Sequence, residues 1–123
     1  MTTPILRQRD VLIASLPPDL TDGDLAALRD DLAQRVGSQR ARGVVLDVSA
    51  LNLVDSYAAR TLRTIAHTAR LRGAETVIVG IQPDVAFAMV QLGITLEDVA
   101  TALDLEEGLA LLAASAQSRR PAE

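Results

Sequence analysis

The sequence predicts one α/β domain whose sheet is mixed but mostly parallel, with four to five strands and about four helices. Two short branched apolar runs, Val44-Val45-Leu46 and Thr76–Val79, indicate strands buried on both faces, as parallel strands are. Segments with helical periodicity alternate with these runs, which favours right-handed strand–helix–strand crossovers. The 123 residues suffice for one hydrophobic core and show no internal repeat or second domain.

The N-terminal part predicts a hairpin followed by a helix. Two short strands, Ile5–Gln8 and Val11–Ala14, are joined by Arg9-Asp10, which suits a tight turn and makes the sheet mixed. Thr21 and Asp24 form a capping box with Asp in place of Glu. The helix that follows has an apolar face at three- and four-residue steps, and Gly37 is its expected C-cap. That face comprises Leu25, Leu28, Leu32 and Val36.

The centre of the chain predicts a buried strand, a linker and a second helix. The strand is Gly43–Val48, and Leu51 and Leu53 of the linker are expected to point inward. Asp55-Ser56 opens a helix over 56–72 that Gly73 ends. Its predicted inner stripe is Ala58, Leu62, Ile65, Ala66 and Ala69.

The last third predicts a strand, a helix, an ambiguous segment and a final helix. After Thr76–Val79, Pro83 stands at a permitted early position of a helix that Gly93 ends. The expected apolar face of that helix is Val85, Met89, Val90 and Leu92. The segment Ile94–Leu103 is ambiguous, although Val99–Ala102 fits a short edge strand. Asp104 and Glu107 cap a last helix whose inner face is Leu105, Leu109 and Leu112, and a frayed, flexible tail is expected over 115–123.

Composition excludes several classes of protein. The absence of cysteine excludes disulfides and thiol chemistry. A net charge of −4 and only two aromatic residues argue against nucleic-acid binding. No apolar run approaches the length of a membrane span, and Met1-Thr2-Thr3-Pro4 lacks the features of a signal peptide. We therefore expect a cytoplasmic protein with no nucleic-acid or membrane partner.

The sequence also lacks the parts of a catalytic site. His67 lies eleven residues beyond Ser56 on the same predicted helix, about 16 Å away at ~1.5 Å rise per residue, which excludes a Ser–His pair. No spacing of histidines or carboxylates fits a metal, and the glycines form no phosphate loop. Asp47 is interpreted as a turn acid. We expect no enzyme activity, cofactor or metal.

Ser56 is the candidate functional residue. A hydroxyl at a helix start caps the helix or carries a phosphate that the helix end tolerates well. Arg60, Arg63, His67 and Arg70 form a stripe on the same helix, which is either a solvated face or a docking surface for an acidic partner. Arg60 stands four residues from Ser56, within reach of such a phosphate.

Several motifs together resemble the STAS domain, the anti-sigma-factor-antagonist fold. They are Val45-Leu46-Asp47-Val48, Asp55-Ser56, Arg72-Gly73-Ala74, Gly80-Ile81-Gln82-Pro83, Leu92-Gly93-Ile94 and the stretch Thr101–Leu109. The second half is similar to the stressosome branch of the family, and specifically to its stand-alone RsbS-type scaffolds. The resemblance places the STAS domain over residues 1–114.

This resemblance implies a phosphorylation switch at Ser56. An RsbT-like serine kinase would be held in a large homo- and hetero-oligomeric assembly with RsbR-like paralogues, and released when Ser56 is phosphorylated. Asp55, Tyr57, Arg60 and Arg63 are the candidate partner-binding residues. Two alternatives stay open. One is a SpoIIAA-like anti-anti-sigma factor that binds an anti-sigma kinase directly, and the other is a small enzyme or ligand-binding module with an anion site at the helix start.

Overall fold

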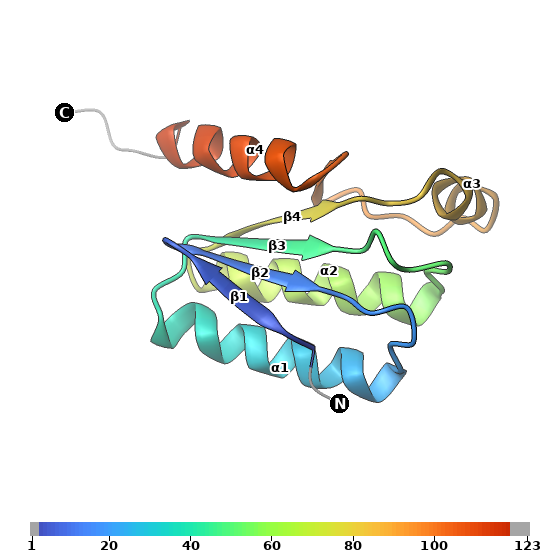
Figure 1. Ribbon diagram of the computed structural model, residues 1–123, viewed down its shortest axis with the longest axis horizontal. Coiled ribbons are helices and arrows are strands. Elements are labelled where there is room, and N and C mark those ends of the chain that lie inside the picture. Colours follow the sequence, from blue (N-terminus) through green and yellow to red (C-terminus); the bar gives the residue numbers. More distant parts are fainter. Residues whose placement is uncertain (1–2, 119–123) are drawn as a thin grey trace.

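A computed structural model describes residues 3–118 and shows the predicted α/β architecture (Figure 1). Within these residues there are five strands and four helices. The strands are β1 (Ile5–Gln8), β2 (Val11–Ser15), β3 (Gly43–Asp47), β4 (Glu75–Val79) and β5 (Ala100–Ala102). The helices are α1 (Asp22–Ser38), α2 (Ser56–Leu71), α3 (Pro83–Gln91) and α4 (Leu105–Ser118). Element types and order agree with the prediction, and the ambiguous segment contains the edge strand β5.

The sheet is mixed, as predicted. Its strand order is β1-β2-β3-β4-β5, in which β1 and β2 form an antiparallel hairpin and all other neighbours are parallel. Loops that follow β2, β3, β4 and β5 therefore emerge at one edge of the sheet, which we call the C-terminal edge. Loops that precede β3 and β4 lie at the opposite, N-terminal edge, together with the β1–β2 turn.

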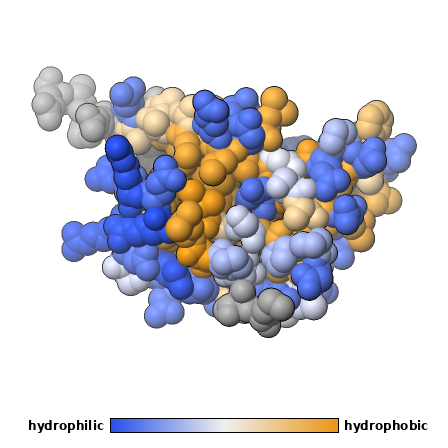
Figure 2. Space-filling model, viewed as in Figure 1, coloured by the Kyte–Doolittle hydropathy of each residue, from blue (hydrophilic) through white to orange (hydrophobic). Residues whose placement is uncertain are grey.

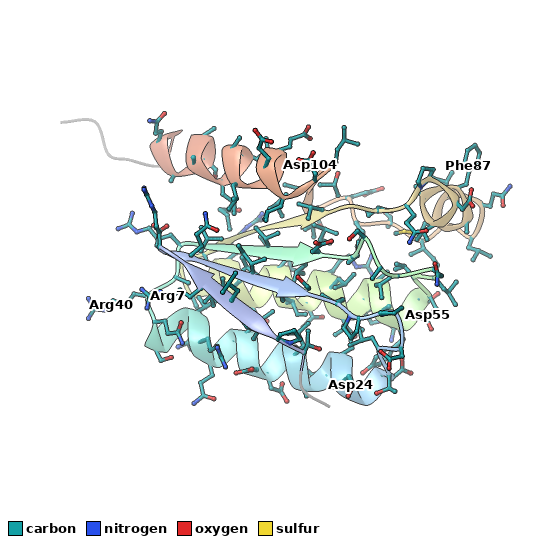
Figure 3. All side chains as sticks on the ribbon, viewed as in Figure 1. Arg7, Asp24, Arg40, Asp55, Phe87 and Asp104 are labelled. Atoms are coloured by element: carbon teal, nitrogen blue, oxygen red, sulfur yellow. The ribbon has the colours of Figure 1, made fainter. Side chains whose placement is uncertain are left out.

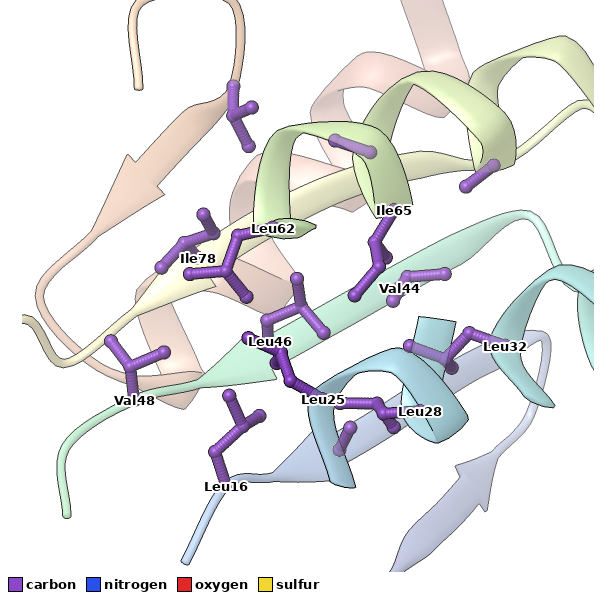
Figure 4. Packing of buried hydrophobic residues seen from close by; sticks show 14 of the residues in the cluster. Leu16, Leu25, Leu28, Leu32, Val44, Leu46, Val48, Leu62, Ile65 and Ile78 are labelled. Atoms are coloured by element: carbon purple, nitrogen blue, oxygen red, sulfur yellow. The ribbon is translucent and has the colours of Figure 1, made fainter. Parts of the chain in front are cut away.

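Helices cover the two faces of the sheet unequally. Figure 1 shows α1 and α2 side by side on one face, where they enclose the main hydrophobic core. In Figure 4, Leu28 and Leu32 of α1 and Leu62 of α2 converge on Val44 and Leu46 of β3. On the other face, α4 alone packs over a smaller cluster centred on Val45, Val77 and Leu112. α3 covers neither face and lies beside the C-terminal edge (Figure 1).

The capping predictions are confirmed at the N-terminal ends of α1 and α4 and wrong at the C-terminal end of α1. The Thr21–Asp24 capping box begins α1, and the Asp104 carboxylate accepts a hydrogen bond from the Glu107 N–H at 2.9 Å at the start of α4. Gly37, however, is not the C-cap of α1. The helix continues to Ser38, its C-cap is Gln39, and the left-handed residue beyond it is Arg40, with φ 51°. The Ala41 N–H then closes the helix end on the Val36 carbonyl at 3.1 Å.

Four of the apolar residues expected to be buried are exposed. Leu53 stands in a loop, where no periodicity fixes its side, and Leu51 and Val54 take the buried positions there. In α3 the buried pair is Val85 and Met89, one turn apart. The exposed residues are Leu53 at 62%, Val90 at 79%, Leu92 at 67% and Leu105 at 36%.

Two smaller expectations also need correction. In α2 the buried alanine of the first turn is Ala59, whereas Ala58 is only half-buried. The final helix runs to Ser118, four residues past the boundary expected at 114, because Ala113, Ala114 and Ala116 favour helix. The rest of the expected tail, 119–123, lies outside the described residues.

Candidate functional site

The start of α2, which carries Ser56, is presented by a loop that the sheet holds in place. Asp47 at the end of β3 accepts a hydrogen bond from the Ser49 N–H at 2.9 Å, so its predicted role as a turn acid is confirmed. The Val48 N–H donates to the Val79 carbonyl at 3.0 Å. From the loop before α3, the Gln82 side-chain amide donates to the Ser49 carbonyl at 2.7 Å. The segment that leads to Ser56 is therefore tied to the end of β4 and to the loop that follows β4.

Two residues of this loop are buried, and those that follow each of them are exposed. Leu51 and Val54 are anchored in the main core at 6% and 3% exposure. Leu53, Asp55 and Ser56 are all exposed. Beside them is a shallow depression, whose other wall is the segment between β2 and α1, including Pro18 and Thr21. The C-terminal edge thus presents Ser56 next to an apolar side chain and a carboxylate.

The helix is capped by Asp55, so of the two roles considered for the Ser56 hydroxyl the structure does not show the cap. Asp55 is the N-cap residue, and its carboxylate accepts a hydrogen bond from the Ala58 N–H at 2.8 Å. Ser56 is the first helical residue, and its hydroxyl makes no hydrogen bond within residues 3–118. The backbone N–H groups of the first helical turn point out of the helix end, where the helix dipole favours negative charge. The Ser56 hydroxyl is therefore free to react.

Tyr57 and Thr61 sit on the inner side of the same turn. Tyr57 is half-buried and packs against the main core, so only part of its side chain is available to a partner. The Thr61 hydroxyl donates to the Tyr57 carbonyl at 2.9 Å, and Thr61 is 5% exposed. Thr64, in contrast, is exposed, and its hydroxyl donates to the Arg60 carbonyl at 3.0 Å.

The predicted basic stripe of α2 is largely engaged with the chain itself. Arg63 donates to the Thr95 carbonyl at 3.1 Å. The His67 Nε2 lies 3.9 Å from the Asp98 carboxylate, and an Arg70 guanidinium nitrogen lies 3.6 Å from the Glu75 carboxylate. Arg60 is exposed and has no side-chain partner within residues 3–118. Of the stripe, only Arg60 is therefore both free and one turn from Ser56.

The sequence prediction missed three residues that shape this region: Gln82, Thr95 and Asp98. Their partners are 31 to 33 residues away in sequence or on another element, so no local spacing signals the contacts. For Gln82, the sequence offered its place in the Gly80-Ile81-Gln82-Pro83 motif, directly before the predicted helix, but no sign of its partner.

The arrangement suits acceptance of a phosphate better than catalysis. His67 stands eleven residues along α2 from Ser56, about 16 Å at ~1.5 Å per residue, so it does not serve as a base for this hydroxyl. Among residues 3–118, no group of three or more histidine, aspartate or glutamate side chains is placed to hold a metal ion. In the same range, no helix combines the length and apolar character that crossing a bilayer requires.

The fold is that of a STAS domain. The family described as STAS domain matches residues 3–108, and the chain belongs to this family. The predicted resemblance is therefore confirmed.

Relatives from the stressosome branch are among the most similar proteins. A serine-to-glutamate variant of RsbS from Moorella thermoacetica superimposes with a TM-score of 0.80 at 33% identity, over 94% of this chain and 97% of that chain. A chain described under "Molecular architecture of the stressosome, a signal integration and transduction hub" gives a TM-score of 0.76 at 33% identity, over 95% and 100%. The "RsbT co-antagonist protein RsbRA" of Bacillus subtilis is 30% identical over 67% of this chain. That match spans only 30% of RsbRA, so the chain corresponds to a minor part of this longer relative.

Proposed function

We propose that this protein is a non-enzymatic phosphorylation switch and scaffold of the RsbS type, acting in the cytoplasm as part of a stressosome. In this proposal it assembles with RsbR-like STAS proteins and itself, and together they hold an RsbT-like serine kinase. Phosphorylation of Ser56 releases the kinase. The observation that carries the proposal is that Asp55 caps α2, which leaves the adjacent Ser56 hydroxyl exposed and unbonded.

A phosphate on Ser56 fits the local electrostatics. It would add roughly −1.5 to −2 charges at the N-terminal end of a helix, where the helix dipole stabilises an anion. Arg60 is four residues further along α2, the spacing at which side chains on one helix face meet. The modified helix would therefore stay folded, and the change would be in the charge of the surface rather than in the fold.

That change of charge is sufficient to release a partner. The surface next to Ser56 combines exposed Leu53 with the carboxylate of Asp55. A kinase that covers this surface would have to desolvate the phosphate or meet it with like charge. A penalty of about 3 kcal/mol weakens binding roughly a hundredfold. Asp55, Tyr57 and Arg60 are the proposed contact residues, and Arg63 contributes mainly through its bond to Thr95.

Likeness to RsbS and to a stressosome chain at 33% identity supports the scaffold role, and the RsbRA match supports RsbR-like partners. The test is co-purification of an RsbT-like kinase from the same genome with this protein, followed by intact-mass analysis after Mg-ATP is added. We expect one phosphate on the unmodified protein, on Ser56, and loss of the kinase from the complex. Ser56→Ala should retain the kinase, and Ser56→Asp should bind it poorly.

Two outcomes would contradict the proposal. Equal kinase binding by Ser56→Ala and Ser56→Asp would remove the switch. A one-to-one complex with an anti-sigma factor, without assembly with an RsbR-like protein, would instead favour the SpoIIAA-like alternative. Asn52→Ala is the matched control, because Asn52 is exposed in the same loop and its side chain takes part in no hydrogen bond or ion pair within residues 3–118.

A further inference from the structure

The N-terminal edge of the sheet, opposite Ser56, contains a hollow lined by three arginines. It has a volume of about 430 Å³ and is bounded by Arg40 and Arg42, which precede β3, and by Arg72, which follows α2. Its apolar floor includes Val36 from α1 and Leu112 and Ala116 from α4. Figure 3 shows Arg40 at the end of the molecule opposite Asp55 and Asp24, and Figure 2 shows hydrophilic side chains gathered at that end.

The three guanidinium groups have no anionic partner within residues 3–118. Arg40, Arg42 and Arg72 are exposed and take part in no side-chain hydrogen bond or ion pair in that range. The hollow also contains the carboxylate of Glu75, which lies 3.6 Å from Arg70. On a chain whose net charge is −4, this concentration of positive charge is local and pronounced.

Helix dipoles explain only part of this arrangement. Arg72 directly follows α2, where a cation is favoured by the C-terminal end of the helix. Arg42 lies beyond α1 at the entrance to β3, and its backbone is held on both sides: its N–H donates to the Asp10 carbonyl at 2.7 Å, and its carbonyl accepts from the Glu75 N–H at 3.0 Å. This backbone anchoring fixes the origin of the Arg42 side chain at the rim of the hollow.

At two positions of the hollow the residue is not the one that the backbone conformation favours: a glycine stands inside a helix, and an arginine stands at a left-handed position. Gly37 stands inside the last turn of α1, where glycine is less favourable than alanine by about 1 kcal/mol. A Cβ there would lie 1.8 Å from an Arg72 guanidinium nitrogen, so the missing side chain is what lets Arg72 lie across the end of α1. Arg40 occupies a left-handed position, with φ 51°, where glycine is the common residue.

Departures of this kind are concentrated at functional sites. Within residues 3–118 the non-glycine residues with positive φ are Arg9 and Arg40, both arginines and both at this edge of the sheet. Arg9 shares a neighbouring groove with Arg42. The chain thus accepts unfavourable backbone conformations at two arginines of this edge, of which Arg40 lines the hollow and Arg9 lines the neighbouring groove.

We propose that this hollow is a binding site for a small organic compound that carries two or more phosphate groups. Arginine forms charge-assisted, often bidentate hydrogen bonds with phosphate oxygens, and three of them match a ligand with several negative charges. The apolar floor of Val36, Leu112 and Ala116 accommodates the organic part of the ligand. The volume of about 430 Å³ falls within the range of small-molecule sites. The site lies at the opposite edge of the sheet from Ser56 and does not depend on the function proposed above.

Pyrophosphate is the probe for the phosphate part of the ligand. Titration into isotopically labelled protein at about 0.15 M salt, followed by amide NMR, should give saturable shifts at Arg40, Arg42 and Gly73, with a dissociation constant at or below about 1 mM. Inorganic phosphate should bind more weakly, because it carries less charge. Shifts that rise linearly without saturation, or that spread evenly over the surface, would overturn the proposal.

Point variants distinguish a specific binding site from nonspecific attraction of pyrophosphate to arginine side chains. Arg72→Gln and Arg40→Gln should each weaken pyrophosphate binding roughly tenfold, since each removes a charge-assisted contact. Gly37→Ala should weaken it too, although it leaves every arginine in place, because the new methyl displaces the Arg72 guanidinium. Arg29→Gln is the control, because Arg29 pairs with Asp30 at 3.0 Å on α1, away from the hollow. Equal weakening by Arg29→Gln, or none by Arg72→Gln and Gly37→Ala, would refute the site.

Discussion

The Asp55 carboxylate accepts a hydrogen bond from the Ala58 backbone N–H at 2.8 Å, and this one contact separates the roles of two adjacent residues. Asp55 caps the N-terminal end of α2, so the side chain of the neighbouring Ser56 is not needed to cap the helix. A phosphorylation site benefits from this division, because its hydroxyl can change chemically while the helix start keeps its cap.

Stability measurements should show that Asp55, and not Ser56, stabilises the start of α2. Asp55→Ala should lower the free energy of unfolding by about 1 kcal/mol, the usual effect of losing a cap. Ser56→Ala should change it by less than about 0.5 kcal/mol, as an exposed substitution does. Urea denaturation of the two variants beside the parent protein provides the comparison. A larger loss for Ser56→Ala than for Asp55→Ala would show that the serine caps the helix after all.

The Gln82–Ser49 hydrogen bond at 2.7 Å predicts how firmly the Ser56 loop is held. Gln82→Ala should cost about 0.5–1.5 kcal/mol locally and speed amide hydrogen exchange over residues 49–53. Gln91→Ala, an exposed glutamine at the end of α3, is the matched control and should leave that exchange unchanged. Unaltered exchange in Gln82→Ala would mean that the strands alone hold the loop.

Thr61 should not be a second phosphorylation site. Its hydroxyl is committed to the Tyr57 carbonyl and its side chain is 5% exposed, so a kinase would have to open α2 to reach it. Incubation of Ser56→Ala with the kinase and Mg-ATP, followed by peptide mass mapping, should give no phosphate on Thr61. Thr64 is the exposed comparison on the same helix. Phosphate on Thr61 in a folded protein would contradict this expectation.

The sequence predicted what local patterns encode. Branched apolar runs identified β3 and β4, and side-chain spacing identified the Thr21 and Asp104 caps. Hydrophobicity shows that a residue prefers burial but not whether a neighbour takes the buried position first, which is why Leu53 and Val90 were misplaced.

Local sequence patterns do not predict contacts between segments that are far apart in the sequence. Ser56 was identified correctly as the first residue of α2, yet the bonds from Gln82 to its loop and from Arg63 to Thr95 join segments that only the fold brings together. The arginine hollow is similar, since its arginines come from two connections at one edge of the sheet and its apolar residues from α1 and α4.

Close packing of α4 on the sheet predicts a specific effect at Gly108. A Cβ at this position would lie 2.6 Å from a Val79 methyl and 3.3 Å from a Val77 methyl. Gly108→Ala should therefore lower stability by about 1–2 kcal/mol, despite the better helix propensity of alanine. Gly23→Ala in α1 is the control, because its Cβ would make only an ordinary contact of 3.8 Å with the Thr21 hydroxyl. Urea denaturation in which both variants are equally stable would show that α4 shifts freely on the sheet.

The capping box of α1 predicts how stability depends on pH. The Thr21 backbone N–H donates to the Asp24 carboxylate at 3.2 Å, and this bond, with that to the Thr21 side chain, holds the pKa of Asp24 below its ordinary value of 3.8. Because the folded-state pKa is the lower one, the contribution of Asp24 to stability is present above the unfolded pKa. It is lost as the pH falls through the folded pKa.

Asp24→Asn tests this dependence, because asparagine does not titrate. The parent protein should be the more stable of the two at pH 7. The difference should begin to shrink as the pH falls below the unfolded-state pKa of Asp24, about 3.8, and disappear below the lower folded-state pKa. Denaturant titrations of both proteins at several pH values between 7 and 3 measure it. Asp30→Asn is a suitable comparison, since Asp30 pairs with Arg29 on the exposed side of the same helix and takes no part in the cap. A difference for Asp24→Asn that stays constant down to pH 3 would show that the charge of Asp24 does not stabilise the helix start.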